Sequence, residues 1–194
     1  MEKGNKKKKE LQSALKTLAI EKGYANVTMK DIGNYVGISV GGLYHHYHST
    51  EEIFNDLIKS ETSNVWDGFS DVKSFDELMD CLNIYFESEK KELLGKEPSL
   101  NTLLYQYYFS HPESRRIEIM KLAHDETIDA MMKILNQVYK DKKLCREMSE
   151  HIYLSLHGLV DLSFSNSIRR KIIENEIELL KIYLTKMYKK QEEE

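Results

Sequence analysis

The chain has 194 residues, of which 41% are hydrophobic and 31% charged, and its formal net charge is −4. This composition is typical of a soluble globular protein with one or two compact domains. Only Pro98 and Pro112 interrupt the chain, whereas Leu, Ile, Lys and Glu are abundant, which favours long helices over a turn-rich β fold. We expect an all-α protein of about nine helices.

No apolar stretch has the length of a transmembrane helix, and the charged N-terminal segment lacks the apolar run of a signal peptide. Cys81 and Cys145 lie in apolar helical patterns without a CxxC partner, which indicates reduced, buried thiols. We therefore expect a cytoplasmic protein with no membrane partner.

The charge is distributed unevenly along the chain. Residues 1–50 hold eight lysines and four acidic residues, a net charge of +4, so the remainder carries −8. Because salt screens charges over about 8–10 Å, a phosphate backbone beside the first segment would respond mainly to its positive charge. The pattern indicates a small basic segment followed by a larger acidic body. We expect two domains, at residues 1–58 and 59–194, and call the first the basic domain after its lysine-rich start.

Two capped helices open the basic domain. Apolar residues recur on one face of residues 7–22, and Gly23 ends that helix. The hydroxyl of Thr28 and the carboxylate of Asp31 have the spacing of a capping box, which predicts a second helix over residues 28–36.

A turn and two further helices follow. Gly37 permits the positive φ of a tight turn, and Ser39 caps a third short helix. Ser49 and Glu52 repeat the capping-box spacing and open a fourth helix. This succession of short helices around a turn is typical of a helix-turn-helix module.

Longer helices with few breaks fill the rest of the sequence. The lysine cluster at the start and the “QEEE” tail at the end are expected to be disordered. Capping signals and apolar periodicity predict helices over residues 74–94, 99–109, 110–139, 144–165 and 172–189.

Gly41 and Gly42 stand inside the third predicted helix, where each costs about 1 kcal/mol relative to alanine. The missing side chains let the helix backbone come close to a DNA groove. Ser39 and Val40 lie at the leading end of this helix, the end that recognition helices present to base edges. Ser39 can bond a base or a phosphate, and Val40 can contact a thymine methyl group.

Tyr44 and His45 follow one turn later and suit contacts to phosphate oxygens. We expect Tyr47 to face inward and to anchor the short helix to the first helix. A metal site made by His45, His46 and His48 is disfavoured, because adjacent positions on a helix diverge by about 100°.

Residues 11–58 resemble the tetracycline-repressor (TetR) family of bacterial transcriptional regulators, through “ALKTLAIEKGY” and “VTMKDIGNYVGISVGGLYHHYHSTEEIF”. The positions that agree with the family pattern are Thr28, Ile32, Gly37, Ser39, Gly42, Leu43, Tyr44, His46, Tyr47, Glu52 and Ile53. The resemblance implies a homodimer whose helical C-terminal part binds a small molecule and then releases operator DNA. The residues that it brings toward DNA are Thr28, Ser39, Tyr44 and His45.

The sequence departs from that pattern at Val40 and Thr50, where many relatives carry a basic residue. We therefore expect the lysine cluster to supply sequence-independent affinity, with about 0.9 of salt slope for each phosphate neutralised. A merely solubilising tail is the alternative. The predicted DNA-contacting residues are Lys6, Lys7, Lys8, Lys9, Thr28, Ser39, Val40, Gly41, Gly42, Tyr44, His45 and Thr50.

The last two predicted helices carry apolar stripes with a period near 3.5 residues, the pattern of helices that pack lengthwise. An intramolecular core explains either stripe alone. Together with the resemblance, they favour a four-helix interface between two subunits that read an inverted repeat. The predicted dimerisation residues are Met148, Ile152, Ser155, Leu156, Leu159, Ile173, Ile177, Leu180, Leu184 and Met187.

The segment from residue 74 to 139 is rich in aromatic and soft side chains, which line either an apolar ligand cavity or plain core. The resemblance favours a pocket for an apolar or aromatic effector that changes the angle between the two domains. The predicted ligand-binding residues are Tyr85, Phe86, Tyr105, Tyr108, Phe109, Met120, His124, Ile128 and Met131.

The sequence leaves two alternative functions. In “HDET” at residues 124–127, a His and an Asp are adjacent on a predicted helix, as in helical metal-dependent phosphohydrolases, whose sites need further histidines and a distant aspartate. The spacing of the available residues does not force such a site, so we expect no enzyme activity, metal or cofactor. A DNA-binding architectural or recruiting protein without ligand control is the second alternative. The available residues are His111, His151, His157 and Asp161.

Overall fold

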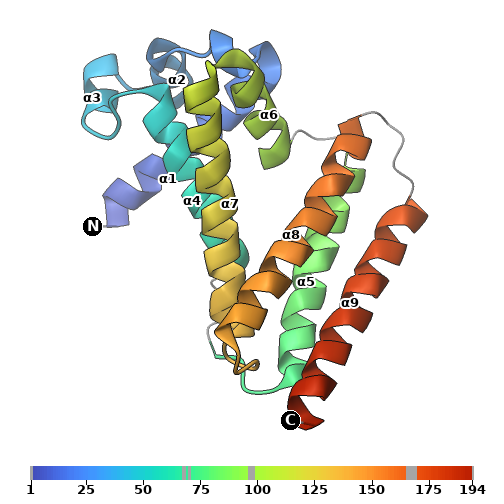
Figure 1. Cartoon of the computed structure of the whole chain (residues 1–194). Helices are drawn as coiled ribbons and strands as arrows, with labels where there is room; N and C mark the ends of the chain where they lie inside the picture. Colours follow the sequence, from blue (N-terminus) through green and yellow to red (C-terminus); the bar gives the residue numbers. More distant parts are fainter. Residues whose placement is uncertain (1, 67–68, 70, 96–98, 165–169, 194) are drawn as a thin grey trace. The chain divides into compact units, whose positions relative to one another are not determined.

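The structure, a computed structural model, describes residues 2–66, 69, 71–95, 99–164 and 170–193 (Figure 1). Nine α-helices and one 3-10 helix form the regular structure of these residues, and none of them lies in a strand. The all-α prediction is confirmed. The elements are α1 (Glu2–Lys22), η1 (Tyr24–Asn26), α2 (Met29–Val36), α3 (Val40–Tyr44), α4 (Thr50–Trp66), α5 (Phe75–Leu94), α6 (Leu100–Ser110), α7 (Glu113–Leu135), α8 (Lys142–Phe164) and α9 (Arg170–Glu193).

Three helix ends differ from the sequence prediction by four residues or more. α1 begins at Glu2 and α9 continues to Glu193, so the prediction of disordered ends was wrong for these residues. Both ends are rich in Lys, Glu and Gln, which have high helix propensity. α7 ends at Leu135 instead of Tyr139: the amides of Gln137 and Val138 each donate to the carbonyl oxygen three residues earlier, at 3.0 Å, in place of the α-helical bond to the fourth.

The chain forms two compact units, one of residues 1–62 and 98–124 and one of residues 63–97 and 125–194. Each unit combines two separate stretches of sequence. The first unit therefore contains α6 and the start of α7 besides the four N-terminal helices. These units are defined by packing, and the assignment of domains at residues 1–58 and 59–194 stays a prediction.

An aromatic cluster joins α6 to the N-terminal helices of the first unit. The rings of Phe54 and Tyr107 stack with centroids 5.1 Å apart, and the ring of Tyr24 lies 5.2 Å from each of them. The Tyr107 hydroxyl donates a hydrogen bond of 2.6 Å to Glu51 Oε1. The backbone amide of Tyr24 donates one of 3.0 Å to Gln106 Oε1. Aromatic pairs of this kind contribute about 0.5–1.5 kcal/mol beyond their buried area.

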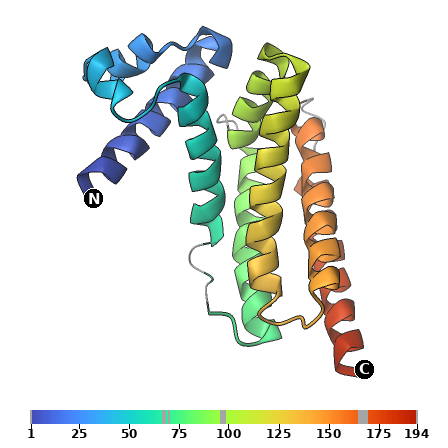
Figure 2. The same ribbon diagram turned by 60° about the vertical axis from the view of Figure 1, so that its left-hand side comes forward.

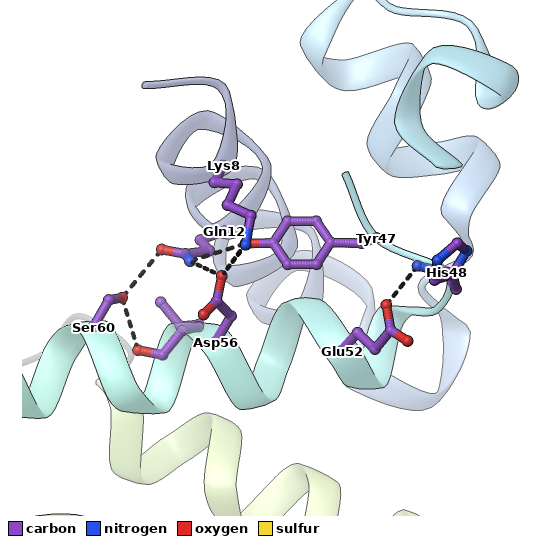
Figure 3. A network of polar contacts seen from close by, with 8 residues as sticks. Lys8, Gln12, Tyr47, His48, Glu52, Asp56 and Ser60 are labelled. Atoms are coloured by element: carbon purple, nitrogen blue, oxygen red, sulfur yellow. Dashed lines mark hydrogen bonds and ion pairs between the residues drawn. The ribbon is translucent and has the colours of Figure 1, made fainter. Parts of the chain in front are cut away.

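Tyr47 connects α3 to α1 and α4 within the same unit (Figure 3). Its side chain is 3% exposed, and its hydroxyl donates to Asp56 Oδ2 at 2.6 Å and accepts from Gln12 Nε2 at 3.1 Å. Burial, and then the bond to the Asp56 carboxylate, raise the pKa of Tyr47, so the hydroxyl stays protonated. The prediction that Tyr47 anchors the short helix to the first helix is confirmed.

Helices α5, α8 and α9 pack along one another in the second unit (Figure 1). Their facing stripes are buried, and the Tyr139 hydroxyl donates a 2.8 Å hydrogen bond to the carbonyl oxygen of Leu184. Cys145 is fully buried, and this burial raises the pKa of its thiol to about 11. Cys81 is half-buried, and both cysteines are free thiols.

We predict that Tyr47→Phe lowers the free energy of unfolding by about 1–3 kcal/mol, because it leaves Gln12 and Asp56 without their shared partner. Urea denaturation at neutral pH measures this loss. Tyr44→Phe is the matched control, because the side chain of Tyr44 is 46% exposed. It should change the stability by less than about 0.5 kcal/mol. Equal effects of the two variants would contradict the prediction.

Candidate nucleic-acid interface

α3 has one anchored face and one open face. Leu43 is fully buried in the core of the first unit. Ser39, Gly41, Tyr44 and His45 are exposed. Both views place this helix at the periphery of the first unit (Figure 1 and Figure 2). The predicted recognition helix therefore presents its leading end and its glycine-bearing face to the surroundings.

The glycines at and before α3 differ in their backbone φ and in the space available for a Cβ atom. Gly37 ends α2 with φ 72°, in the left-handed region that favours glycine. Gly41 and Gly42 do not have positive φ, and a Cβ at Gly41 would meet only Ser39 Oγ, at 4.0 Å. A Cβ at Gly42 would lie 3.3 Å from the same oxygen. The fold therefore requires glycine at residue 37 but not at residue 41.

Ser39 fixes the start of α3. Its backbone is extended, and its Oγ accepts a 3.0 Å hydrogen bond from the amide of Gly42, as the cap of a short helix should. A similar arrangement starts α4, where Ser49 Oγ accepts from the amide of Glu52 at 3.1 Å. The Glu52 carboxylate in turn accepts from the amide of His48 at 2.6 Å (Figure 3). The predicted caps are confirmed.

Thr28 and Asp31 form the predicted capping box of α2, with the Thr28 Oγ1 to Asp31 Oδ2 distance at 2.6 Å. The hydrogen bond from Lys22, with 2.7 Å between Nζ and Oδ2, and those from Thr28 hold the pKa of the Asp31 carboxyl well below its usual range. Thr28 is exposed, whereas Val40 and Thr50, the first residues of α3 and α4, are half-buried.

The four predicted lysines of α1 have different surroundings. Lys7 pairs with an acidic residue one turn further along the helix, and Lys8 Nζ lies 3.1 Å from Asp56 Oδ2. Lys6 and Lys9 are exposed and form no ion pair with any described residue. Lys6 and Lys9 are therefore the two lysines of this group whose charges the described chain leaves unpaired.

Comparison with known proteins agrees with this geometry. Residues 11–57 match the profile of the bacterial regulatory proteins of the tetR family. This match covers the predicted helix-turn-helix segment, 47 of the chain's 194 residues. A match in Bacillus subtilis (strain 168), described as the uncharacterized HTH-type transcriptional regulator YfiR, is 39% identical over 56 residues. That match spans 29% of this chain and 27% of the relative.

Solved structures of three proteins share the fold over most of the chain. A Syntrophomonas wolfei protein described as a TetR-family transcriptional regulator has a TM-score of 0.66 at 16% identity, over 93% of this chain and 96% of that one. Reduced NemR from E. coli has a TM-score of 0.65 at 12% identity, over 90% and 95%. NalD from Pseudomonas aeruginosa has a TM-score of 0.60 at 16% identity, over 91% and 94%.

The predicted ligand-binding residues are divided between the two units. Tyr108 and Met120 meet in the first unit at a cavity of about 370 Å³, whereas Phe109 is 76% exposed. The other members in the first unit are Tyr105 and His124, and those in the second unit are Tyr85, Phe86, Ile128 and Met131. All four of the second group are buried.

The predicted dimerisation residues lie inside the second unit. Ile173 and Leu184 are 0% exposed and Leu180 is 1% exposed in the single chain. Ser155 and Met187 are half-buried, and the remaining buried members are Met148, Ile152, Leu156, Leu159 and Ile177. Packing within one chain therefore accounts for the burial of both stripes. The large apolar side chains that these helices leave exposed are Leu154, Ile172, Leu179 and Ile182.

Two half-buried charged residues, Glu89 and Arg116, were missed in the sequence. Burial, and then the nearby charge of Glu92, raise the pKa of Glu89 in α5 to about 8. Arg116 in α7 has an Nε that is fully screened from solvent and has no hydrogen-bond partner among the described residues. Both lie at helical spacing from apolar neighbours, Glu89 three residues after Phe86 and Arg116 three before Ile119. A charge on an apolar helix face was the signal that could have found them.

The described residues offer neither a metal cluster nor a membrane-spanning helix. In the described part of the chain, His, Cys, Asp and Glu side chains form no group of three suited to a metal ion. The side chain of Asp161, one of the residues available to a phosphohydrolase site, lies outside the described residues. No helix in the described ranges has an apolar run long enough to cross a bilayer.

We predict opposite effects of two glycine-to-alanine changes on stability. Gly37→Ala should lower the free energy of unfolding by about 1–2 kcal/mol, because alanine is strained at positive φ. Gly41→Ala should leave the stability unchanged or raise it by up to about 1 kcal/mol, because its methyl group enters open space on a helix. Thermal and urea denaturation measure both. A destabilised Gly41→Ala variant would show that the fold itself requires this glycine.

Proposed function

We propose that this protein is a homodimeric transcriptional regulator that binds an inverted-repeat operator and is released from it by a small apolar ligand. The observation that carries the proposal is the exposed, glycine-bearing face of α3 on a helix whose other face is buried. The match of residues 11–57 to the tetR family supports the same conclusion.

Two features support insertion of α3 into a major groove. The exposed Gly41 costs helix stability and meets no contact that would require glycine, so close approach by an outside molecule explains it. Ser39, at the leading end, and Tyr44 and His45, one turn later, are all exposed beside it. These side chains suit base edges and phosphate oxygens, respectively.

The charge distribution supports a nucleic-acid partner. Residues 1–50 carry a net charge of +4, and Lys6, Lys9 and Lys30 are exposed without an ion pair among the described residues. Each lysine that neutralises a phosphate releases counterions and adds to affinity in a salt-dependent manner. Lys8 contributes less in this proposal, because Asp56 already lies 3.1 Å from its ammonium group.

Dimerisation is supported by the outward face of the last two helices. Ile172, Leu179 and Ile182 of α9 are 41%, 59% and 51% exposed, and their spacing of seven and three residues is that of a helix-packing seam. Leu154 of α8 is 67% exposed as well. A second copy of the chain would cover these apolar side chains, and two linked recognition helices read more sequence than one.

An effector role is supported by the relatives. NalD is the secondary repressor of the MexAB-OprM multidrug efflux pump, and FadR from Bacillus halodurans is a fatty acid degradation regulator with a TM-score of 0.57 at 14% identity. The aromatic and methionine side chains of α5 to α7 suit a ligand of apolar or aromatic character. The ligand would act by favouring one of two arrangements of the dimer.

Selection of duplexes from a random DNA pool tests DNA binding, and we expect an inverted repeat. Gly41→Ala should then weaken binding to the selected duplex by about 1–3 kcal/mol, the cost of one mismatched base pair, while keeping wild-type stability. Ser88→Ala, an exposed change in α5, is the control and should bind as wild type. Recovery of no preferred sequence, or wild-type affinity in Gly41→Ala, would contradict the proposed recognition helix.

Sedimentation equilibrium tests the dimer. The wild type should be dimeric at micromolar concentration, and Leu179→Glu combined with Ile182→Glu should give a folded monomer, because two charges would be placed in an apolar interface. Ile84→Glu is the matched control, since Ile84 is 62% exposed on α5. A monomeric wild type, or dissociation by the Ile84 variant alone, would overturn this part of the proposal.

A further inference from the structure

Arg116 of α7 carries a charge that no described residue neutralises. Its Nε is fully screened from solvent and has no hydrogen-bond partner in the described chain, and the arginine forms no ion pair there. The ring of Tyr108 lies below the guanidinium group, with 5.0 Å between its centroid and Cζ. A buried N–H donor without an acceptor destabilises a protein, and the cost is larger for a charged group.

A cavity of about 370 Å³ opens beside this guanidinium group, between α6 and α7 of the first unit. Three of its lining side chains offer apolar or aromatic surface, namely Tyr108, Ile117 and Met120. Ile117 is 61% exposed, so it offers apolar surface that a ligand can cover. The volume falls within the range of about 300–1,000 Å³ that is typical of small-molecule sites.

Arg115 shows what an arginine does here when it has partners within the chain. Its Nη1 lies 3.0 Å from a carboxylate oxygen of Glu118 and 3.7 Å from one of Glu51. Arg116 points to a different side of the helix, because successive residues are rotated by about 100°. The chain therefore pairs one of two adjacent arginines internally and leaves the other at the cavity.

We propose that the cavity beside Arg116 binds a small organic carboxylate with an apolar body. The carboxylate accepts hydrogen bonds from the guanidinium group at the cavity wall, while the apolar body covers Ile117 and Met120. A planar guanidinium group matches the two oxygens of a carboxylate better than an ammonium group does. This inference names the effector class within the proposed function, and only its effect on DNA rests on that function.

One lining residue opposes the anion. Glu113 lines the same cavity, is exposed, and precedes Arg116 by three residues without forming an ion pair with it. Its negative charge lowers the affinity for a carboxylate. Neutralising it in Glu113→Gln should therefore strengthen binding, a result that a purely apolar site would not give.

Titration calorimetry on the full chain with octanoate, 1-octanol and acetate tests the proposal. Octanoate should bind at least about tenfold more tightly than either of the other two, because a hydrogen bond to a charged group adds to the apolar contact. Arg116→Met should remove that advantage and leave the affinity for 1-octanol unchanged. Retained binding of 1-octanol also shows that the variant is folded around its cavity.

Arg115→Met is the matched control and should bind octanoate as the wild type does, since Arg115 has internal partners. The proposal is overturned if octanoate binds no better than 1-octanol, or if the Arg115 and Arg116 variants lose equal affinity. Operator binding is measured separately with and without octanoate. If octanoate binds through Arg116 without changing operator affinity, the carboxylate site is supported and the effector role is refuted.

Discussion

A helix of five residues is not stable by itself in water. The exposed face of α3 therefore depends on the contacts that hold this helix against the rest of the first unit. Leu43 in α3 and Tyr47, three residues after its end, anchor the helix in the core; they are 0% and 3% exposed. The Tyr47 hydroxyl reaches α1 and α4 together through Gln12 and Asp56. Because the anchor lies on one side, the other side can carry residues that add nothing to stability, Gly41 among them.

The aromatic cluster of the first unit extends this dependence beyond the N-terminal helices. Tyr107 of α6 stacks on Phe54 of α4 and hydrogen-bonds Glu51 at the start of the same helix. The helix that follows α3 is thus held from the N-terminal side by Tyr24 and from the later part of the chain by Tyr107. Residues as far apart in the sequence as Tyr24 and Tyr107 therefore both stabilise the helices that position α3.

Local chemistry made much of this fold predictable. The caps at Thr28, Ser39 and Ser49, and the positive φ of Gly37, each depend on residues within a few positions, so the sequence alone predicts them correctly. Non-local packing was harder to predict. The stripe through Ile177 has the same periodicity whether it faces its own chain or a second copy, and only the structure shows that its own chain buries it.

Glu89 and Arg116 show where a simple division into apolar core and polar surface fails. A charged side chain on an apolar helix face destabilises the fold unless it is paired, so folding alone does not explain either residue. Removing a charged group from water without a partner costs free energy. For Glu89 this cost appears as a raised pKa, and for Arg116 as an Nε without a hydrogen-bond partner. Some residues destabilise the fold and have no partner in the chain that offsets the cost. Such residues are candidates for a functional role. Gly41 is a third such residue: glycine lowers the stability of a helix, and no contact within the chain requires it at this position.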